Sequence, residues 1–280
     1  MKIFSQILDR KRNAVAQLRA DPSSSDFGAR ALEIRKTASP HRLLRALEVD
    51  SQRPNIIAEF KRRSPSAGMI RDDLTVSEIV HSYQRGGACA ISILTDEQYF
   101  GGSILDLRAA RSTTHLPLLR KDFIIDSIQI FEAAIAGADA VLLIVGALDD
   151  ISLGELRVLA EDELGLDAVV EVHSSEELRR AQNSGATIIG VNNRDLRTFQ
   201  VSLNTSERLI SEVRPDRILV SESGLQSADS LRRLRKIGFR GFLIGEALMR
   251  APDPETALRN LIGAAEARQF TEGLIRAQQQ

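Results

Sequence analysis

Six side chains that can donate, accept or orient protons lie at the ends of short apolar segments of this sequence. They are three glutamates, two lysines and an asparagine: Glu59, Glu171, Glu222, Lys61, Lys121 and Asn192. Lysine and glutamate act as general acids and bases when their surroundings adjust their pKa values. This set suits a reaction built from proton transfers and does not call for a metal ion.

The segments that precede these residues recur at intervals of roughly 20 to 35 residues, which is the size of a βα unit. Uniformly apolar strands that alternate with amphipathic helices are typical of a parallel sheet covered on both faces, and about eight units favour a closed barrel over an open sheet. We therefore expect an α/β protein, a single (β/α)8 TIM barrel with an N-terminal helical extension. The predicted strands are 56–60, 88–93, 116–119, 140–144, 168–172, 187–191, 217–220 and 241–245.

The boundaries follow from the same pattern. We expect one domain over residues 1–280, with the extension at 1–50 and the barrel at 54–265. Apolar residues at helical spacing predict a first helix over 3–18. Ser39 and Pro40 predict a helix that runs to Leu47, with Ser39 as its N-cap and Pro40 as its first helical residue.

A barrel of this kind gathers catalytic groups at the carboxyl ends of its strands. Glu59 and Lys61 are two positions apart, so they project to the same face of their strand. Because an unpaired buried charge costs several kcal/mol, we expect the lysines and glutamates to share one mouth and to compensate one another.

The last two strands and the first loop are candidates for binding phosphate, since barrels often hold this group between the seventh and eighth βα loops. Glycine there lets backbone N–H groups approach the oxygens. Glu246 could either repel a phosphate or cap the helix that it begins. The loop 62–68 is basic and hydroxylated and could close over an anion. The candidates are Ser64, Ser223, Gly224, Gly245 and Glu246.

Composition excludes several classes of function. The formal net charge is −1, which gives no global attraction to nucleic acid or to an anionic membrane, and the one cysteine, Cys89, suits a reducing compartment. No apolar run reaches the roughly 20 residues of a membrane span, so we expect a cytoplasmic protein. The four histidines are scattered without ligand spacing, and a structural role is expected for His173. We expect no metal and no cofactor.

At these positions the sequence resembles the indole-3-glycerol-phosphate synthase family, from about Ile3 to Met249. The resemblance implies a barrel whose N-terminal extension helps to cover the pocket. It also implies that 1-(2-carboxyphenylamino)-1-deoxyribulose 5-phosphate is converted into indole-3-glycerol phosphate, CO2 and water, in tryptophan biosynthesis. The matching segments are IIAEFKRRSPS (56–66), LTDEQYFGGS (94–103), LRKDFI (119–124), EVH (171–173), IGVNNRDL (189–196), SESG (221–224) and LIGEALM (243–249).

The resemblance makes the six proton-handling residues its catalytic set and places Arg194 near the substrate. Lys121 is expected to protonate the ketone, and Glu171 with Asn192 to serve the later proton removal and loss of water. Lys61 is expected to hold the substrate carboxylate, with the acid role in dehydration left open between the two lysines. Glu59 would orient the lysines, and Glu222 the sugar hydroxyls. Apolar walls for the anthranilate ring are expected from Phe123, Leu142 and Leu196.

Two other functions fit the same pattern. One is another phosphate-binding barrel enzyme, such as phosphoribosylanthranilate isomerase, although its chemistry calls for a cysteine base where Lys61 stands. The other is a barrel that binds phosphorylated ligands without turnover, which would not need charged proton donors held at a cost. The expected partner is a small phosphorylated substrate, with the chain a monomer or a weak homodimer.

Overall fold

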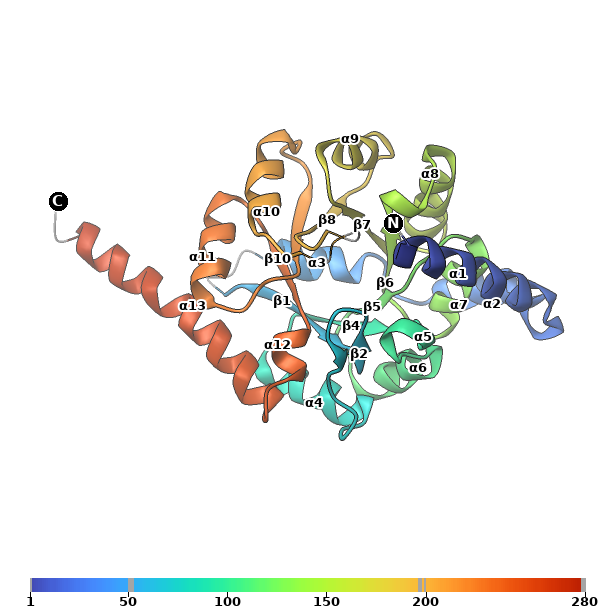
Figure 1. Cartoon of the computed structure of the whole chain (residues 1–280), viewed down its shortest axis with the longest axis horizontal. Helices are drawn as coiled ribbons and strands as arrows, with labels where there is room; N and C mark the ends of the chain where they lie inside the picture. The colour runs from blue at the N-terminus through green and yellow to red at the C-terminus, as the bar shows by residue number, and fades with distance from the viewer. Residues whose placement is uncertain (1, 50–52, 196–197, 199, 278–280) are drawn as a thin grey trace.

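The computed structural model describes residues 2–49, 53–195, 198 and 200–277. Its centre is a closed barrel of eight parallel strands in the order β1-β10-β9-β8-β7-β6-β5-β4, which confirms the predicted fold class (Figure 1). The strands are β1 (Asn55–Phe60), β4 (Ala90–Leu94), β5 (Leu118–Lys121), β6 (Ala140–Ile144), β7 (Asp167–Val172), β8 (Ile188–Asn192), β9 (Ile218–Glu222) and β10 (Gly241–Ile244).

The alternation of side chains along each strand divides the core into two layers. Ile56, Ala58 and Phe60 of β1 point outward and pack against the helices. Ile57, between them, points into the barrel with interior residues of the other strands, such as Leu142 and Val169. Glu59 has the same parity as Ile57, so the pleat directs its carboxylate into the interior at the carboxyl end of β1.

Helices form the outer ring, and the long last helix, α13, runs past the edge of the barrel (Figure 1). The ring consists of α4 (Val76–Gly86), α6 (Ile104–Thr113), α7 (Ser127–Ile135), α8 (Asp150–Val158), α9 (Ser175–Asn183), α10 (Asn204–Leu209), α11 (Ala228–Ile237) and α13 (Pro254–Ala277). Shorter elements lie in the loops: β2 (Arg63–Ser64), β3 (Gly68–Met69), α5 (Glu97–Phe100), α12 (Glu246–Met249) and the irregular helical turns η1 (Pro22–Ser24), η2 (Val145–Ala147), η3 (Leu159–Glu163) and η4 (Ile210–Glu212).

The N-terminal segment provides helices for both ends of the barrel. It contains α1 (Lys2–Ala20), α2 (Phe27–Arg35) and α3 (Arg42–Glu48). On α1, Lys11 Nζ lies 2.6 Å from Asp122 Oδ1 and 3.2 Å from Asp96 Oδ2, two carboxylates that follow the carboxyl ends of β5 and β4. Phe4 of α1 stacks at a tilt on Phe123, with ring centroids 6.2 Å apart. These contacts fix α1 at the carboxyl-terminal mouth.

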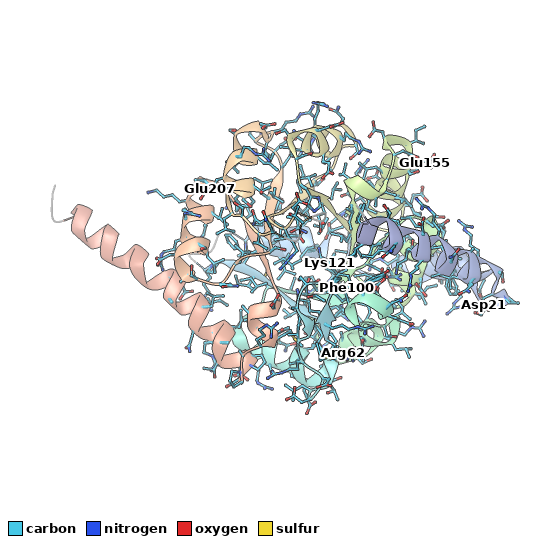
Figure 2. All side chains as sticks on the ribbon, in the orientation of Figure 1. Asp21, Arg62, Phe100, Lys121, Glu155 and Glu207 are labelled. Carbon is cyan, nitrogen blue, oxygen red and sulfur yellow. The ribbon has the colours of Figure 1, made fainter. Side chains whose placement is uncertain are left out.

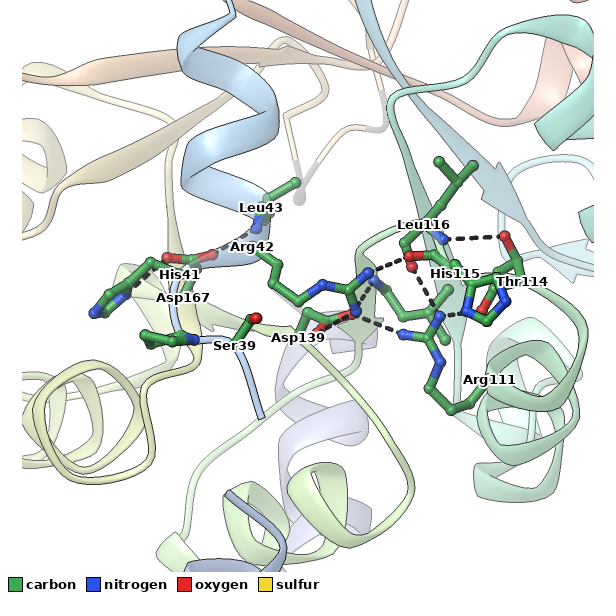
Figure 3. Close-up of polar contacts among 12 residues, drawn as sticks. Ser39, His41, Arg42, Leu43, Arg111, Thr114, His115, Leu116, Asp139 and Asp167 are labelled. Carbon is green, nitrogen blue, oxygen red and sulfur yellow. Dashed lines mark hydrogen bonds and ion pairs between the residues drawn. The ribbon is translucent and has the colours of Figure 1, made fainter. Parts of the chain in front are cut away.

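At the opposite end, α3 closes the barrel floor. Leu43 and Leu47 are fully buried in the interior cluster. Asp167 Oδ2, at the start of β7, accepts hydrogen bonds from the backbone N–H groups of Leu43 and Leu44 at 2.8 and 3.0 Å, and His41 contacts the other oxygen (Figure 3). Figure 3 also shows Arg42 and Arg111 converging on Asp139, which precedes β6.

Two local predictions were wrong for identifiable reasons. The third helix begins at Arg42 with His41 as N-cap in a left-handed conformation (φ 50°), instead of being capped by Ser39. The distant carboxylate of Asp167 satisfies the first amides, so no local serine is needed. The strand predicted over 116–119 begins instead at Leu118. Pro117 has no N–H group for the ladder, so the strand starts after it and ends on Lys121.

Candidate active site

A cavity of about 220 Å³ opens at the carboxyl ends of the strands. All six predicted proton-handling residues line it, and they come from β1, β5, β7, β8, β9 and the loop after β1. Figure 2 shows Lys121 and Phe100 close to each other near the centre of the molecule. The strand register thus brings together residues that are far apart in the sequence.

Lys121 is held between two carboxylates. Its Nζ lies 2.8 Å from Glu171 Oε2 and 2.6 Å from Glu222 Oε2. Asn192 Nδ2 donates to the other oxygen of Glu171 at 3.1 Å, and Asn192 Oδ1 accepts from the backbone N–H of Arg194 at 3.0 Å. Asn192 is therefore fixed in the orientation that presents its N–H to Glu171.

Glu59 and Lys61 form a second pair, with Lys61 Nζ 2.6 Å from Glu59 Oε1. Two glycines make room for the buried carboxylates. A Cβ on Gly245 would lie 2.4 Å from Glu59 Oε1, and a Cβ on Gly190 would lie 2.2 Å from Glu222 Oε1. Any larger residue at either position would displace the glutamate, so both glycines shape the site.

Burial and charge set the protonation of the central cluster. Burial lowers the pKa of Lys121, but Glu171, Glu222 and Glu59 raise it more, and the net pKa lies well above the usual 10.5. Burial raises the pKa of Glu171, yet Lys121 and His173 outweigh it and keep that pKa well below its usual range. Burial, with the charge of Glu171 opposing Lys121, raises the pKa of Glu222 to about 7. A proton added to the cluster therefore goes to Glu222 first.

Two further residues support the cluster, and sequence reasoning missed both roles. His173 Nε2 lies 3.3 Å from Glu171 Oε1, at the end of the EVH segment. Asn193 is buried between β8 and β9. Its amide nitrogen donates to the carbonyl oxygens of Glu222 and Ser223 at 3.0 and 3.2 Å, and its oxygen accepts from Ser206. Asn193 thus fixes the backbone that carries Glu222.

The cavity is also lined by the predicted phosphate-binding residues Ser64, Ser223, Gly224, Gly245 and Glu246, and by Arg194, which was expected near the substrate. Ser223 adopts a left-handed conformation with φ 66°, which is uncommon for a residue other than glycine and often marks a functional loop. Arg194 Nη1 donates to Ser66 Oγ at 3.3 Å. Glu246 Oε1 accepts from Arg250 at 3.1 Å, so the charge of Glu246 is partly compensated on the outer side.

The two arginines of the first loop do not line the cavity. Arg62 forms a two-point contact with Asp106 of α6, and Arg63 donates to the carbonyl oxygens of Glu97 and Gln98 of α5. Their charges hold the β2–β3 hairpin against the barrel. The hydroxylated tip, including Ser64 and Ser66, is the part that faces the cavity.

Apolar side chains form another part of the cavity lining. Phe123 and Leu142 line the cavity as expected, together with Leu94, Phe100 and Leu243. The rings of Phe100 and Phe123 lie 6.3 Å apart at a tilt of 37°. Leu196, the third expected wall residue, lies outside the described residues. In the described part of the chain, no group of three or more His, Cys, Asp or Glu side chains is arranged to hold a metal ion.

Comparisons with solved structures agree with this fold. The 3-hexulose-6-phosphate synthase from Salmonella typhimurium superposes with a TM-score of 0.59 at 16% identity, covering 75% of this chain and 98% of that chain. The KGPDC from Streptococcus mutans gives a TM-score of 0.57 at 17% identity over 77% of this chain and 98% of that one. At such identities the likeness concerns the fold alone.

Sequence comparisons are more specific. The model of the family "Indole-3-glycerol phosphate synthase" matches residues 4–261. The indole-3-glycerol phosphate synthase of Syntrophobacter fumaroxidans is 46% identical over 267 residues, which cover 94% of this chain and 98% of that protein. The enzyme of the same name from Bacteroides thetaiotaomicron is 45% identical over 94% of this chain and 99% of its own length. The predicted resemblance is confirmed, and this chain belongs to the indole-3-glycerol phosphate synthase family.

Proposed function

We propose that this protein closes the indole ring of 1-(2-carboxyphenylamino)-1-deoxyribulose 5-phosphate and releases indole-3-glycerol phosphate, CO2 and water. The observation that carries the proposal is the buried cluster of Lys121 with Glu171 and Glu222, which shares one cavity with an apolar wall. Membership of the family supports the same carboxy-lyase reaction.

Ring closure requires an acid at the ketone oxygen, and Lys121 is the best placed. Its ammonium group is central in the cavity and stays protonated because two carboxylates surround it. The high pKa makes Lys121 a weak acid in the ground state. An alkoxide that develops on the ketone oxygen is far more basic than the ketone, so the proton moves as the aromatic carbon attacks.

The later steps need a base and a second acid. Loss of CO2 restores the aromaticity of the benzene ring. Glu171 is ionised and oriented by Asn192, so it can remove the proton that leaves the new five-membered ring together with the hydroxyl group, as water. Lys61, which pairs with Glu59, would bind the substrate carboxylate before CO2 leaves. Glu222 would bind the sugar hydroxyls from its side of Lys121.

The rest of the cavity orients the substrate. The apolar wall of Phe123 and Leu142 suits the anthranilate ring, whose burial excludes water from the reacting atoms. Ser64, Arg194 and the loop of Ser223 and Gly224 would bind the phosphate through hydroxyl, guanidinium and backbone groups. Contacts with both groups of residues would fix which way the substrate lies.

The setting of the enzyme is part of the same proposal. We propose that residues 1–280 form one functional domain, in which the extension 1–50 supports the barrel 54–265. None of the helices in the described part combines the length and apolar character that a membrane span requires. We expect a cytoplasmic enzyme, a monomer or weak homodimer, whose partner is its phosphorylated substrate.

Replacing Lys121 with methionine tests the assigned acid. Lys121→Met should lower kcat by a factor of about 1,000 or more while substrate binding weakens much less, since the variant lacks the proton donor but keeps the rest of the cavity lining. The matched control is Lys236→Met, which changes an exposed lysine on α11. Near-normal turnover by Lys121→Met would show that Lys121 is not the acid. Binding without turnover by the unchanged protein would favour a ligand-binding barrel.

A further inference from the structure

The carboxylates buried at the mouth outnumber the lysines that contact them. Three carboxylates, those of Glu59, Glu171 and Glu222, are at most 4% exposed. Two lysines, Lys61 and Lys121, contact them. Burying three carboxylates beside two ammonium groups leaves one negative charge in excess. This excess would favour protonation of one carboxylate.

His173 lies beside this cluster, next to Glu171. It follows β7 two residues after Glu171, and its Nε2 lies 3.3 Å from Glu171 Oε1, on the side away from Lys121. This nitrogen is buried, and among the described residues it has no aligned hydrogen-bond acceptor. At 3.3 Å, Glu171 Oε1 is close enough to this nitrogen for an ion pair when the ring is protonated.

The other side of the ring is anchored by α9. Glu177 Oε2 lies 3.1 Å from His173 Nδ1 and also accepts a hydrogen bond from the backbone N–H of His173 at 2.7 Å. Glu177 is in the first turn of α9, where Ser174 is the N-cap. One helix start thus fixes both the backbone and the ring of His173.

We propose that His173 is a positioning residue for the reaction. As an imidazolium between Glu171 and the more exposed Glu177, it places a positive charge beside Glu171, keeps Glu171 ionised and fixes it as the base. The proposal rests on the proposed function, because it assigns a partner to the base of that reaction.

The electrostatics agree with this arrangement. Burial lowers the pKa of His173, but Glu171 and Glu177 raise it more, to about 10. The titratable groups that reach the cluster around it are Glu171 from β7, Glu177 from α9, and, beyond Glu171, Lys121 from β5 with Glu222 and Glu59. With the imidazolium present, a proton that enters the cluster settles on Glu222 and leaves Glu171 ionised.

His173→Gln removes the charge while keeping an N–H donor near the position of Nε2. Without the positive charge, Glu171 takes up a proton more readily. The pKa of the acid limb in the pH profile of kcat should therefore rise by about one pH unit, and kcat at a given pH on that limb should fall about tenfold. The loss should shrink as the pH increases. A merely structural role would lower kcat by the same factor at every pH.

A second variant and a direct titration keep the test independent of folding. Glu177→Gln should lower the pKa of His173 and produce a smaller shift of the same limb. In the unchanged protein, the ring resonances of His173 in an NMR titration should remain those of the imidazolium through neutral pH. His81→Gln, which alters an exposed histidine on α4, is the control and should leave both readouts unchanged.

The outcomes separate the two proposals. Turnover in the unchanged protein together with the shifted limb and a high pKa of His173 supports the inference. A histidine that titrates near its usual 6.5, or a limb that does not move in His173→Gln, overturns it while the proposed function stands. Absence of turnover in the unchanged protein overturns the proposed function, and the NMR titration still decides whether His173 carries the charge.

Discussion

Lys121 and the two carboxylates around it form a charged site whose burial lowers the stability of the folded protein. Glu222 is 1% exposed and shares Lys121 with Glu171, so one cation serves two buried anions. Burying the second carboxylate is unfavourable, and for this reason the pKa of Glu222 rises to about 7. The free energy of folding therefore includes a penalty that an unreactive barrel would avoid.

Glu222→Gln should remove that penalty. Because the folded-state pKa of Glu222 is raised, its protonated form stabilises the fold below the unfolded-state value of 4.5, and this contribution is lost as the pH rises through about 7. Glutamine stays neutral, so at about pH 8 the variant should be more stable than the unchanged protein by about 1–3 kcal/mol, and at about pH 5 by much less. Turnover should fall, since the sugar hydroxyls lose a charged acceptor.

Urea unfolding at both pH values measures this difference. The control is Glu155→Gln, on the exposed outer side of α8 (Figure 2), where no such change with pH is expected. A Glu222→Gln variant that is less stable than the unchanged protein at the higher pH would mean that attraction to Lys121 outweighs the burial of Glu222.

Among the helices, α1 packs against the apolar wall of the cavity and against the residue that follows Lys121. Phe4 contacts Phe123, a wall residue, while Lys11 contacts Asp122, the residue next to Lys121. Asp122 is 3% exposed, and its pKa is lowered to about 2 because Lys11 and Arg120 together outweigh the effect of burial. The helix is thus linked to the strand that carries the proposed acid.

Lys11→Met should loosen α1 and leave the cluster of Lys121, Glu171 and Glu222 in place, although Asp122, which also lines the cavity, loses one partner. Loss of one partner of a buried ion pair should lower the free energy of unfolding by about 2–4 kcal/mol. A looser wall should raise KM by about threefold to thirtyfold while kcat changes less, since the charged cluster is intact. Steady-state kinetics and hydrogen exchange along α1 measure both effects.

Arg12→Met is the matched control, because Arg12 is exposed and, among the described residues, its ion pair is a local one with Asp9 on the same helix. It should leave KM and the hydrogen exchange of α1 near those of the unchanged protein. If Lys11→Met behaves in the same way, the ion pair is not what holds α1 at the mouth.

Elements whose signals are local could be predicted from the sequence. The β6 strand lies where the apolar run 140–144 predicted it, and the first helix contains the predicted 3–18. The cap of α3 could not be predicted, because the carboxylate that satisfies its amides, Asp167, is 124 positions from Leu43. Ser39 offered a local alternative that the fold does not use.

At the scale of the whole molecule, the barrel explains why the candidate site could be found. Strand ends converge on one mouth whatever their separation in sequence, so Lys121 lies beside Glu171 and Glu222, which are 50 and 101 positions away. The sequence pattern does not reveal which residues hold these side chains in place. The space that Gly190 leaves for Glu222, the anchoring by Asn193 and the contact of His173 with Glu171 depend on side-chain packing across neighbouring strands.

The central claim is that this mouth performs ring closure with loss of CO2. The most direct test is to mix the purified protein with 1-(2-carboxyphenylamino)-1-deoxyribulose 5-phosphate and to measure indole emission and released CO2 in the same sample. The chain contains no tryptophan, so product fluorescence stands out against the protein. If the protein performs this reaction, both signals rise in proportion to the enzyme concentration, with one CO2 released for each indole formed. Saturable binding of the substrate with neither signal would contradict it.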